Sequence, residues 1–205
     1  MSTGLLVVIS APSGCVKGTI LKEVFAKSQN ARFSVSATTR AARPGEVHGE
    51  HYYFVSKEEF ESMITQGKML EHAQFVGNYY GTPREPVENW MAQGYDVFLD
   101  IEVQGGAQVK KLMPECVSIF ILPPSMQVLG ERLRGRGTED EETVKRRLET
   151  AEKEIPHAEE YDYVVYNNRL EDAVDDIMAI LRAEKLKYMR NTDCTERVLN
   201  DAQTV

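Results

Sequence analysis

The chain lacks the features that mark membrane and exported proteins. No apolar run approaches the ~20 residues that a membrane-spanning helix needs. The short apolar stretch near the N-terminus follows no basic segment of the kind that begins a signal peptide. Repeats, low-complexity tracts and interdomain linkers are absent as well. We therefore expect a cytoplasmic protein that has no membrane partner.

The chain also has few cysteines and no net positive charge. The three cysteines, Cys15, Cys116 and Cys194, lie far apart and form no C-x-x-C pair, which indicates neither a disulfide framework nor a zinc site. The net charge of −8 argues against non-specific nucleic-acid binding, so we expect no nucleic-acid partner. In so acidic a chain, any local cluster of arginines is informative.

The length and the apolar pattern indicate a single α/β domain. The 205 residues fit one domain, and a hydrophobic content of 42% is enough for a core. Apolar runs at 5–10, 95–102, 117–122 and 163–166 are separated by segments with helical periodicity. This alternation predicts a parallel core sheet with right-handed crossovers, flanked by helices.

The first apolar run leads directly into a candidate phosphate-binding loop. The loop reads Ala11-Pro12-Ser13-Gly14-Cys15-Val16-Lys17-Gly18-Thr19. A strand, a turn of small residues, a lysine and a helix start suit a P-loop, in which backbone N–H groups and the helix N-terminus face an anion. The motif G-x-x-x-x-G-K-[ST] is met imperfectly, because Ala11, Val16 and Gly18 replace its first glycine, its second glycine and its hydroxyl residue. On these residues alone, an ordinary strand–turn–helix remains open.

Residues 34–83 differ from their surroundings in their short strands and turns, which predicts an inserted subdomain. Arg40 and Arg43 follow three hydroxyl residues there, and arginine forks suit phosphate, although a solvated loop explains two arginines equally simply. Glu71 sits among apolar neighbours in a predicted strand at 69–75. It either faces solvent or recognises a ligand.

Two carboxylates end the apolar run at 95–102. The spacing of two between Asp100 and Glu102 predicts that both side chains lie on one face of the strand. A carboxylate at this place near a P-loop commonly handles Mg²⁺; the alternative, a strand-end charge at the surface, explains one carboxylate better than two.

A basic segment follows the run at 117–122. Its arginines and glycines alternate at 132–137, and further basic residues follow at 145–147. The pattern suggests a mobile flap that closes over polyphosphate, or else a salt-bridged exposed helix. The last helix is expected at about 170–189, and the tail from 191 is expected to be loose.

Several motifs together resemble the guanylate kinase family over nearly the whole chain. They are 10–14 (SAPSG), 36–40 (SATTR), 43–49 (RPGEVHG), 52–55 (YYFV), 77–82 (GNYYGT), 100–105 (DIEVQG), 120–125 (FILPPS) and 132–137 (RLRGRG). The resemblance implies the fold of the P-loop nucleoside monophosphate kinases and the reaction ATP + GMP → ADP + GDP. It also implies a core at about 1–33, 84–126 and 156–190, a GMP-binding subdomain at about 34–83 and a helical lid at about 127–155.

The resemblance assigns roles residue by residue. It implies that the GMP phosphate is held by Arg40, Arg43, Tyr52 and Tyr80, and that guanine is recognised by Ser36, Glu71, Thr82 and Glu102. It implies ATP binding by residues 11–19 and by Asn167, which corresponds to the family's adenine contact. Catalysis falls to Lys17, Arg40, Arg136 and Arg147. Mg²⁺ is the implied cofactor, held through water by Asp100 and by Thr19.

Val16 is the one serious departure from the family pattern. The family has glycine there because the backbone passes close to the β-phosphate. A β-branched side chain predicts normal GMP binding and weakened use of ATP. A guanylate-kinase-like binding module without catalysis is the alternative, but Lys17 and Asp100 persist and favour an enzyme. Another nucleoside monophosphate kinase is disfavoured by Glu71 and Glu102.

Overall fold

A five-stranded parallel sheet forms the centre of the fold. The computed structural model describes residues 3–12, 14–135, 137 and 140–201. Within these residues the strands run across the sheet in the order β2 (Ala31–Phe33), β7 (Asp96–Asp100), β1 (Leu6–Ser10), β8 (Val117–Leu122) and β9 (Tyr163–Tyr166). Because all are parallel, the segments after β1, β7 and β9 emerge at the same edge of the sheet, where α/β proteins bind ligands.

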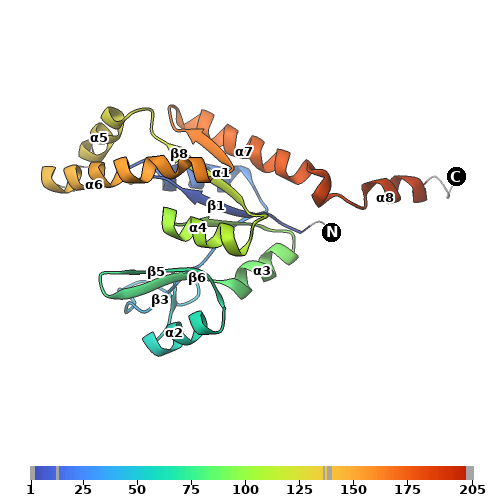
Figure 1. Cartoon of the computed structure of the whole chain (residues 1–205), viewed down its shortest axis with the longest axis horizontal. Coiled ribbons are helices and arrows are strands. Elements are labelled where there is room, and N and C mark those ends of the chain that lie inside the picture. The colour runs from blue at the N-terminus through green and yellow to red at the C-terminus, as the bar shows by residue number, and fades with distance from the viewer. Residues whose placement is uncertain (1–2, 13, 136, 138–139, 202–205) are drawn as a thin grey trace.

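Helices cover both faces of this sheet, as the apolar runs predict (Figure 1). Val7 and Ile9 of β1 pack in one hydrophobic cluster with α1 (Lys17–Lys27) and α7 (Leu170–Leu186). Leu6 and Val8 pack in another with α3 (Arg84–Ala92) and α4 (Val103–Leu112). Successive side chains of a strand point to opposite faces, so β1, which is buried at every position, is apolar from Leu6 to Ile9.

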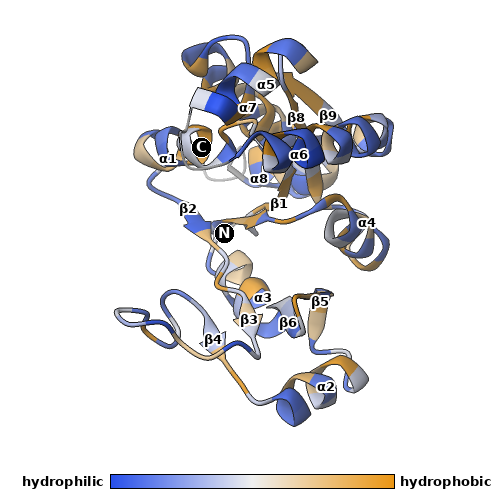
Figure 2. Ribbon diagram, turned by 90° about the vertical axis from the view of Figure 1, so that its left-hand side faces the viewer, coloured by the Kyte–Doolittle hydropathy of each residue, from blue (hydrophilic) through white to orange (hydrophobic). Residues whose placement is uncertain are grey.

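A second, mixed sheet lies apart from the first (Figure 2). Its strand order is β4 (Tyr53–Phe54), β3 (Ala37–Thr38), β6 (Asn78–Pro83) and β5 (Met69–Phe75), with β3 and β4 parallel and the other pairs antiparallel. The helix α2 (Lys57–Thr65) begins with a Ser56 cap that accepts from the Glu59 amide at 3.1 Å. Phe60 of α2 is fully buried against this sheet, which gives the segment a small core of its own.

Two further helices form a layer beyond the P-loop. They are α5 (Met126–Gly135) and α6 (Glu141–Glu154), followed by the 3-10 turn η1 (Ile155–Glu160). Their buried faces meet in a cluster that includes Leu129, Leu133 and Val144. Arg134 on α5 also forms an ion pair with Glu141 on α6 at 2.5 Å. This ion pair therefore links the two helices at their exposed side.

The C-terminal segment is more ordered in secondary structure than the sequence indicates. The helix predicted to reach residue 189 ends at Leu186 and is followed by η2 (Tyr188–Arg190). A further helix, α8 (Cys194–Asp201), occupies part of the tail that was expected to be loose, and it extends away from the rest of the fold (Figure 1). Among the described residues, no helix is both long and apolar enough to cross a membrane.

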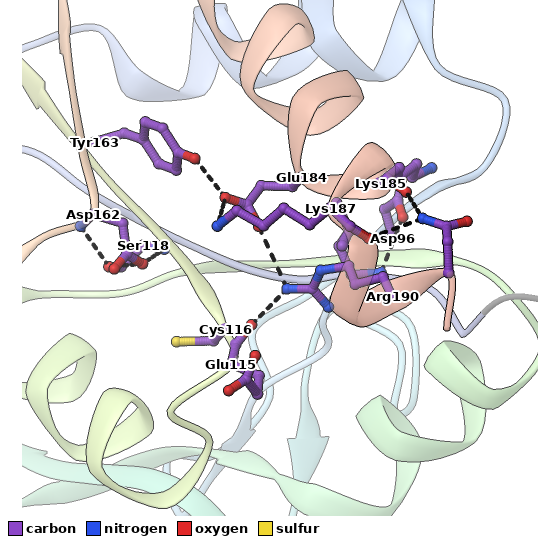
Figure 3. Close-up of polar contacts among 12 residues, drawn as sticks. Asp96, Glu115, Cys116, Ser118, Asp162, Tyr163, Glu184, Lys185, Lys187 and Arg190 are labelled. Atoms are coloured by element: carbon purple, nitrogen blue, oxygen red, sulfur yellow. Dashed lines mark hydrogen bonds and ion pairs between the residues drawn. The ribbon is translucent and has the colours of Figure 1, made fainter. Parts of the chain in front are cut away.

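Buried carboxylates fasten α7 to the sheet at the edge away from the P-loop (Figure 3). Asp96, at the first position of β7, accepts from the Leu5 amide at 3.0 Å and forms an ion pair with Lys185 at 2.5 Å. Glu184 accepts from the Tyr163 hydroxyl at 2.5 Å and forms an ion pair with Lys187 at 2.6 Å. Both acids are nearly inaccessible to solvent, so these partners replace the water that they lose on burial.

Candidate active site

The loop after β1 surrounds a cavity of about 510 Å³. Its lining consists of Ala11, Pro12, Gly14, Cys15, Val16, Lys17, Gly18, Thr19, Glu102 and Glu154. All the predicted loop residues are therefore brought together except Ser13, which lies outside the described residues. Because α1 begins at Lys17, the unpaired amides of a helix N-terminus face this cavity, and such a place favours an anion.

Val16 adopts the left-handed backbone conformation. Its φ is 57° and its ψ is 30°, directly before the first residue of α1. A β-branched residue is a genuine outlier there, since its Cβ crowds the following carbonyl at a cost of roughly 1–2 kcal/mol. The conformation explains why a glycine is expected at this position. At Gly18, by contrast, an added Cβ would meet nothing within 4 Å, so the loop has room for the hydroxyl residue that the motif carries there.

Cys15 turns away from the loop cavity into the core. Its side chain is buried with Leu129 and Leu133 in the cluster of α5 and α6. Burial raises the pKa of its thiol to about 12, against the weaker opposite effect of the positive charges of Arg132 and Lys17. The thiolate required for redox reactions is therefore disfavoured, and the small-filler interpretation of this residue is the better one.

Asn167 lies behind the loop and not in the cavity wall. It follows β9, is 4% exposed, and donates from Nδ2 to the carbonyl oxygen of Cys15 at 2.7 Å. It is not among the residues that line the loop cavity. The side-chain amide that the family resemblance assigns to adenine is thus engaged by the protein's own backbone.

Lys17 and Asp100 form an ion pair at the carboxyl ends of β1 and β7. Both side chains are partly exposed, at 20% and 26% respectively. Glu102 does not share a strand face with Asp100, because β7 ends at Asp100 and Glu102 is the residue that caps α4. The prediction that both carboxylates project from one strand was therefore wrong, since the chain leaves the sheet between them.

A second cavity, of about 280 Å³, lies between the mixed sheet and the start of α4. Its lining includes five of the residues that were assigned to GMP: Ser36, Tyr52, Glu71, Tyr80 and Glu102. Sequence reasoning missed other residues of its wall: Ala73, Phe75, Gly81, Ile101, Gln104 and Gly105. The residues at 34–83 and at 100–105, distant in sequence, thus share one cavity.

Glu71 is the buried carboxylate of this second cavity. It is 7% exposed, and its Oε1 accepts from the Thr82 hydroxyl at 2.7 Å. Burial is the largest effect and raises its pKa, the Thr82 hydrogen bonds act in the opposite direction, and the charge of Glu102 adds to the rise. A Cβ at Gly105 would lie 3.0 Å from Glu71 Oε2, so a glycine there leaves the carboxylate room. Glu71 therefore faces a ligand cavity and not solvent.

Arg40 is held in place by a carboxylate that sequence reasoning did not select. Its guanidinium donates to both oxygens of Glu46, at 2.9 and 2.8 Å, and lies 5.4 Å from the ring centre of Tyr52. Glu46 also accepts a hydrogen bond from the backbone amide of Arg43. The pKa of Glu46 is lowered to about 2, mainly by the hydrogen bond from Arg40. The side chain of Arg43 is exposed and does not line the cavity.

Of the two arginines expected from the lid, only Arg147 lies within the described residues. Arg136 falls outside the described residues. Arg147 is half-buried on α6 and is not part of the cavity wall. Arg132 donates from Nη2 to the carbonyl oxygen of Asn167 at 3.0 Å. Glu154, at the end of α6, does line the cavity, and nothing in its sequence surroundings distinguishes it from the other acids of that helix.

The two cavities meet at shared residues. Glu102 lines both of them, and the Lys17–Asp100 ion pair joins a wall residue of the loop cavity to one of the second cavity. Ser10 adds a hydrogen bond from its hydroxyl to the Ile101 carbonyl at 2.8 Å, which ties the base of the loop to the same junction. A ligand in one cavity would therefore lie next to a ligand in the other.

Known proteins resemble this chain over almost its whole length. A family model described as "Guanylate kinase" matches residues 3–184. The guanylate kinase of Carboxydothermus hydrogenoformans is 50% identical over 190 residues, which is 93% of each chain. That of Desulfitobacterium hafniense is 51% identical over 187 residues, covering 91% of this chain and 94% of its own. The crystal structure of guanylate kinase from Anaplasma phagocytophilum is 42% identical, with a TM-score of 0.70 over 92% of this chain and 90% of that one.

Proposed function

The chain belongs to the guanylate kinase family, whose members transfer a phosphoryl group from ATP to GMP, and we propose how its residues divide that reaction. The sequence left open a binding module without catalysis. The relatives named above are guanylate kinases, so they give that alternative no support. The observation that carries the assignment of roles is the junction of the two cavities at Lys17, Asp100 and Glu102.

Guanine occupies the second cavity in this proposal, where Glu71 and Glu102 accept its hydrogen bonds. Guanine presents N1–H and a 2-amino group as adjacent donors, and carboxylates are their natural acceptors. The Thr82 hydroxyl, bonded to Glu71, keeps one oxygen of that carboxylate oriented, and Ser36 adds a polar group to the wall. AMP lacks these two donors and would leave the buried Glu71 without its ligand partners, a mismatch that can discriminate on the order of 10⁴-fold.

The phosphate of GMP faces Arg40, Tyr52 and Tyr80. The two tyrosines line the cavity, and Arg40 lies over the Tyr52 ring with its orientation set by Glu46. An arginine fork matches two phosphate oxygens better than an ammonium does. Arg43 keeps its proposed role as a second phosphate ligand. Because its side chain is exposed, that role requires the side chain to turn toward the cavity.

ATP places its phosphates in the loop cavity, where they meet the amides at the start of α1. Lys17 exchanges its partner Asp100 for phosphate oxygens and neutralises the charge that develops during transfer. A GMP phosphate oxygen then attacks the γ-phosphorus in line, the bond to the ADP oxygen breaks, and no covalent enzyme intermediate forms. Arg136 and Arg147 are proposed to add positive charge when the lid segment at 127–155 closes.

The donor set at this junction fits Mg²⁺. Asp100 supplies a carboxylate and Thr19 a hydroxyl, both hard oxygen ligands, beside the loop cavity. Among the described residues there is no group of three or more His, Cys, Asp or Glu side chains that could hold a metal alone. This sparse set suits an ion that keeps waters and nucleotide phosphates as its remaining ligands, and that shields the phosphate charge. The cytoplasmic location and the absence of nucleic-acid partners stay predictions.

A coupled assay for ADP formation tests this function. With ATP and Mg²⁺, GMP should support turnover, and AMP should support it on the order of 10⁴-fold less efficiently in kcat/KM. Absence of GMP-dependent ADP formation at high enzyme concentration would overturn the assignment. Equal use of AMP would leave a kinase but remove the proposed role of Glu71 and Glu102.

A further inference from the structure

The carbonyl of Cys15 is fixed from behind by a buried amide. Asn167 Nδ2 donates to this oxygen at 2.7 Å, across 152 residues of sequence. The side chain of Asn167 is 4% exposed, so the bond is made where water cannot replace it. In the loop that lines the cavity, Cys15 is the residue that immediately precedes Val16.

The hydrogen bond acts on the peptide that the left-handed residue must orient. The Cys15 carbonyl belongs to the peptide between Cys15 and Val16, and its direction depends on the φ of Val16, which is 57°. If Val16 relaxed to a negative φ, that peptide would rotate. Its N–H, and those of the first turn of α1, would then lose their direction toward the anion. A valine resists the left-handed conformation, whereas a glycine adopts it freely.

Asn167 is itself held at both of its backbone groups. Its N–H donates to the Leu122 carbonyl of β8 at 2.8 Å, and its carbonyl accepts from Arg132 Nη2 on α5 at 3.0 Å. The residue therefore connects the central sheet and the first lid helix to the phosphate loop. A side chain anchored in this way can hold the strained loop, in addition to the packing of the Cys15 side chain in the core.

We propose that Asn167 is a positioning residue for the ATP phosphates: its amide holds the Cys15 carbonyl and so maintains the left-handed Val16 turn. The inference rests on the proposed function, in that the loop cavity receives the phosphates of ATP. It differs from a direct adenine contact, which the family resemblance implies. Because Asn167 acts through the loop backbone, it should also strengthen the binding of a polyphosphate that carries no adenine base.

The test uses inorganic tripolyphosphate, a ligand with the phosphates of ATP and no adenine. Four full-length proteins are compared by titration calorimetry: wild type, Asn167→Ala, Val16→Gly and the double variant. Asn167→Ala should weaken tripolyphosphate binding about tenfold, the effect of losing one buried hydrogen bond. In the Val16→Gly background, Asn167→Ala should weaken tripolyphosphate binding by less than about twofold, since glycine needs no restraint to stay in the left-handed conformation. The KM for ATP should follow this pattern, while the KM for GMP should not change.

Two results would overturn the proposal. Weakened ATP binding with unchanged tripolyphosphate binding would establish a base contact, and equal losses in both backgrounds would remove the link to Val16. Asn168→Ala, at the exposed neighbouring residue, is the matched control and should match wild type. If Asn167→Ala does not fold, Asn167→Leu keeps the approximate shape, removes the donor without adding charge and serves in its place. Calorimetry needs no turnover, so an absence of GMP-dependent ADP formation would refute the proposed function separately.

Discussion

The two halves of the site are built by different means. In the second cavity, called the guanine cavity from here on because guanine is proposed to bind there, side chains would contact the ligand. These side chains are already held by neighbours: Glu71 by Thr82, and Arg40 by Glu46. In the loop cavity the contacts are mainly backbone amides, and their direction depends on a valine in a conformation that valines avoid. Recognition by side chains tolerates a local change in the backbone, whereas recognition by backbone amides requires one particular backbone conformation. A substitution within one cavity should therefore change the KM for the substrate bound there and leave the KM for the other substrate unchanged.

The largest effect is expected from Lys17, where the halves meet. Lys17→Met removes the charge that pairs with Asp100 and that is proposed to neutralise the transferred phosphoryl group. The kcat should fall on the order of 10³-fold, as for other single groups that stabilise transition-state charge. Lys22→Met, an exposed lysine on the same helix, is the control and should keep wild-type turnover. A fall of less than tenfold for Lys17→Met would show that charge neutralisation comes from elsewhere.

A smaller and more selective effect is expected from the guanine cavity. Glu71→Gln replaces a charged acceptor by a neutral amide and should raise the KM for GMP roughly 10- to 100-fold, the range for a hydrogen bond to a charged group. The KM for ATP should stay within twofold of wild type. Steady-state kinetics with each substrate varied in turn measure both values, with the exposed Glu88→Gln as control. A rise in the KM for ATP as large as that for GMP would contradict the separation of the halves.

The same substitution should have a small, pH-dependent effect on stability. Because the folded-state pKa of Glu71 is raised, the native state binds a proton more tightly than the unfolded state. Stability contributed by this group therefore falls as the pH rises from the ordinary pKa through the raised one. At neutral pH without nucleotide, Glu71→Gln should raise Tm by roughly 2–4 °C, on the order of 1 kcal/mol. Below the ordinary pKa the gain should vanish. Thermal melts at both pH values measure it, and a loss of stability at neutral pH would contradict this interpretation.

Much of the fold followed from local patterns. The apolar runs at 117–122 and 163–166 became β8 and β9. The strand β8 was predictable because burial on both faces of a parallel sheet demands continuous apolar sequence. Glu102 shows the limit of such reasoning. Its spacing from Asp100 matches a strand, but the strand ends before it, and nothing in the spacing reveals where a chain leaves a sheet.

The sequence predicted the loop residues that line one cavity and several residues of the other, but not the contacts that hold them in place. Glu71 and Tyr80 were identified and lie in the cavity wall. The role of Asn167 was not identified, because the hydrogen bond to Cys15 joins two residues that are 152 positions apart. Glu46 was likewise missed, although it lies only six residues from Arg40. No local pattern distinguishes a carboxylate that orients an arginine from one that faces solvent.

The most direct test of the difference between the halves is the pair of KM values in Val16→Gly. The substitution relieves the strain of the loop and touches no residue of the guanine cavity wall. The account predicts that the KM for ATP falls on the order of fivefold, as expected for relief of 1–2 kcal/mol of backbone strain, with the KM for GMP unchanged. An unchanged KM for ATP, or an equal change in both values, would contradict it.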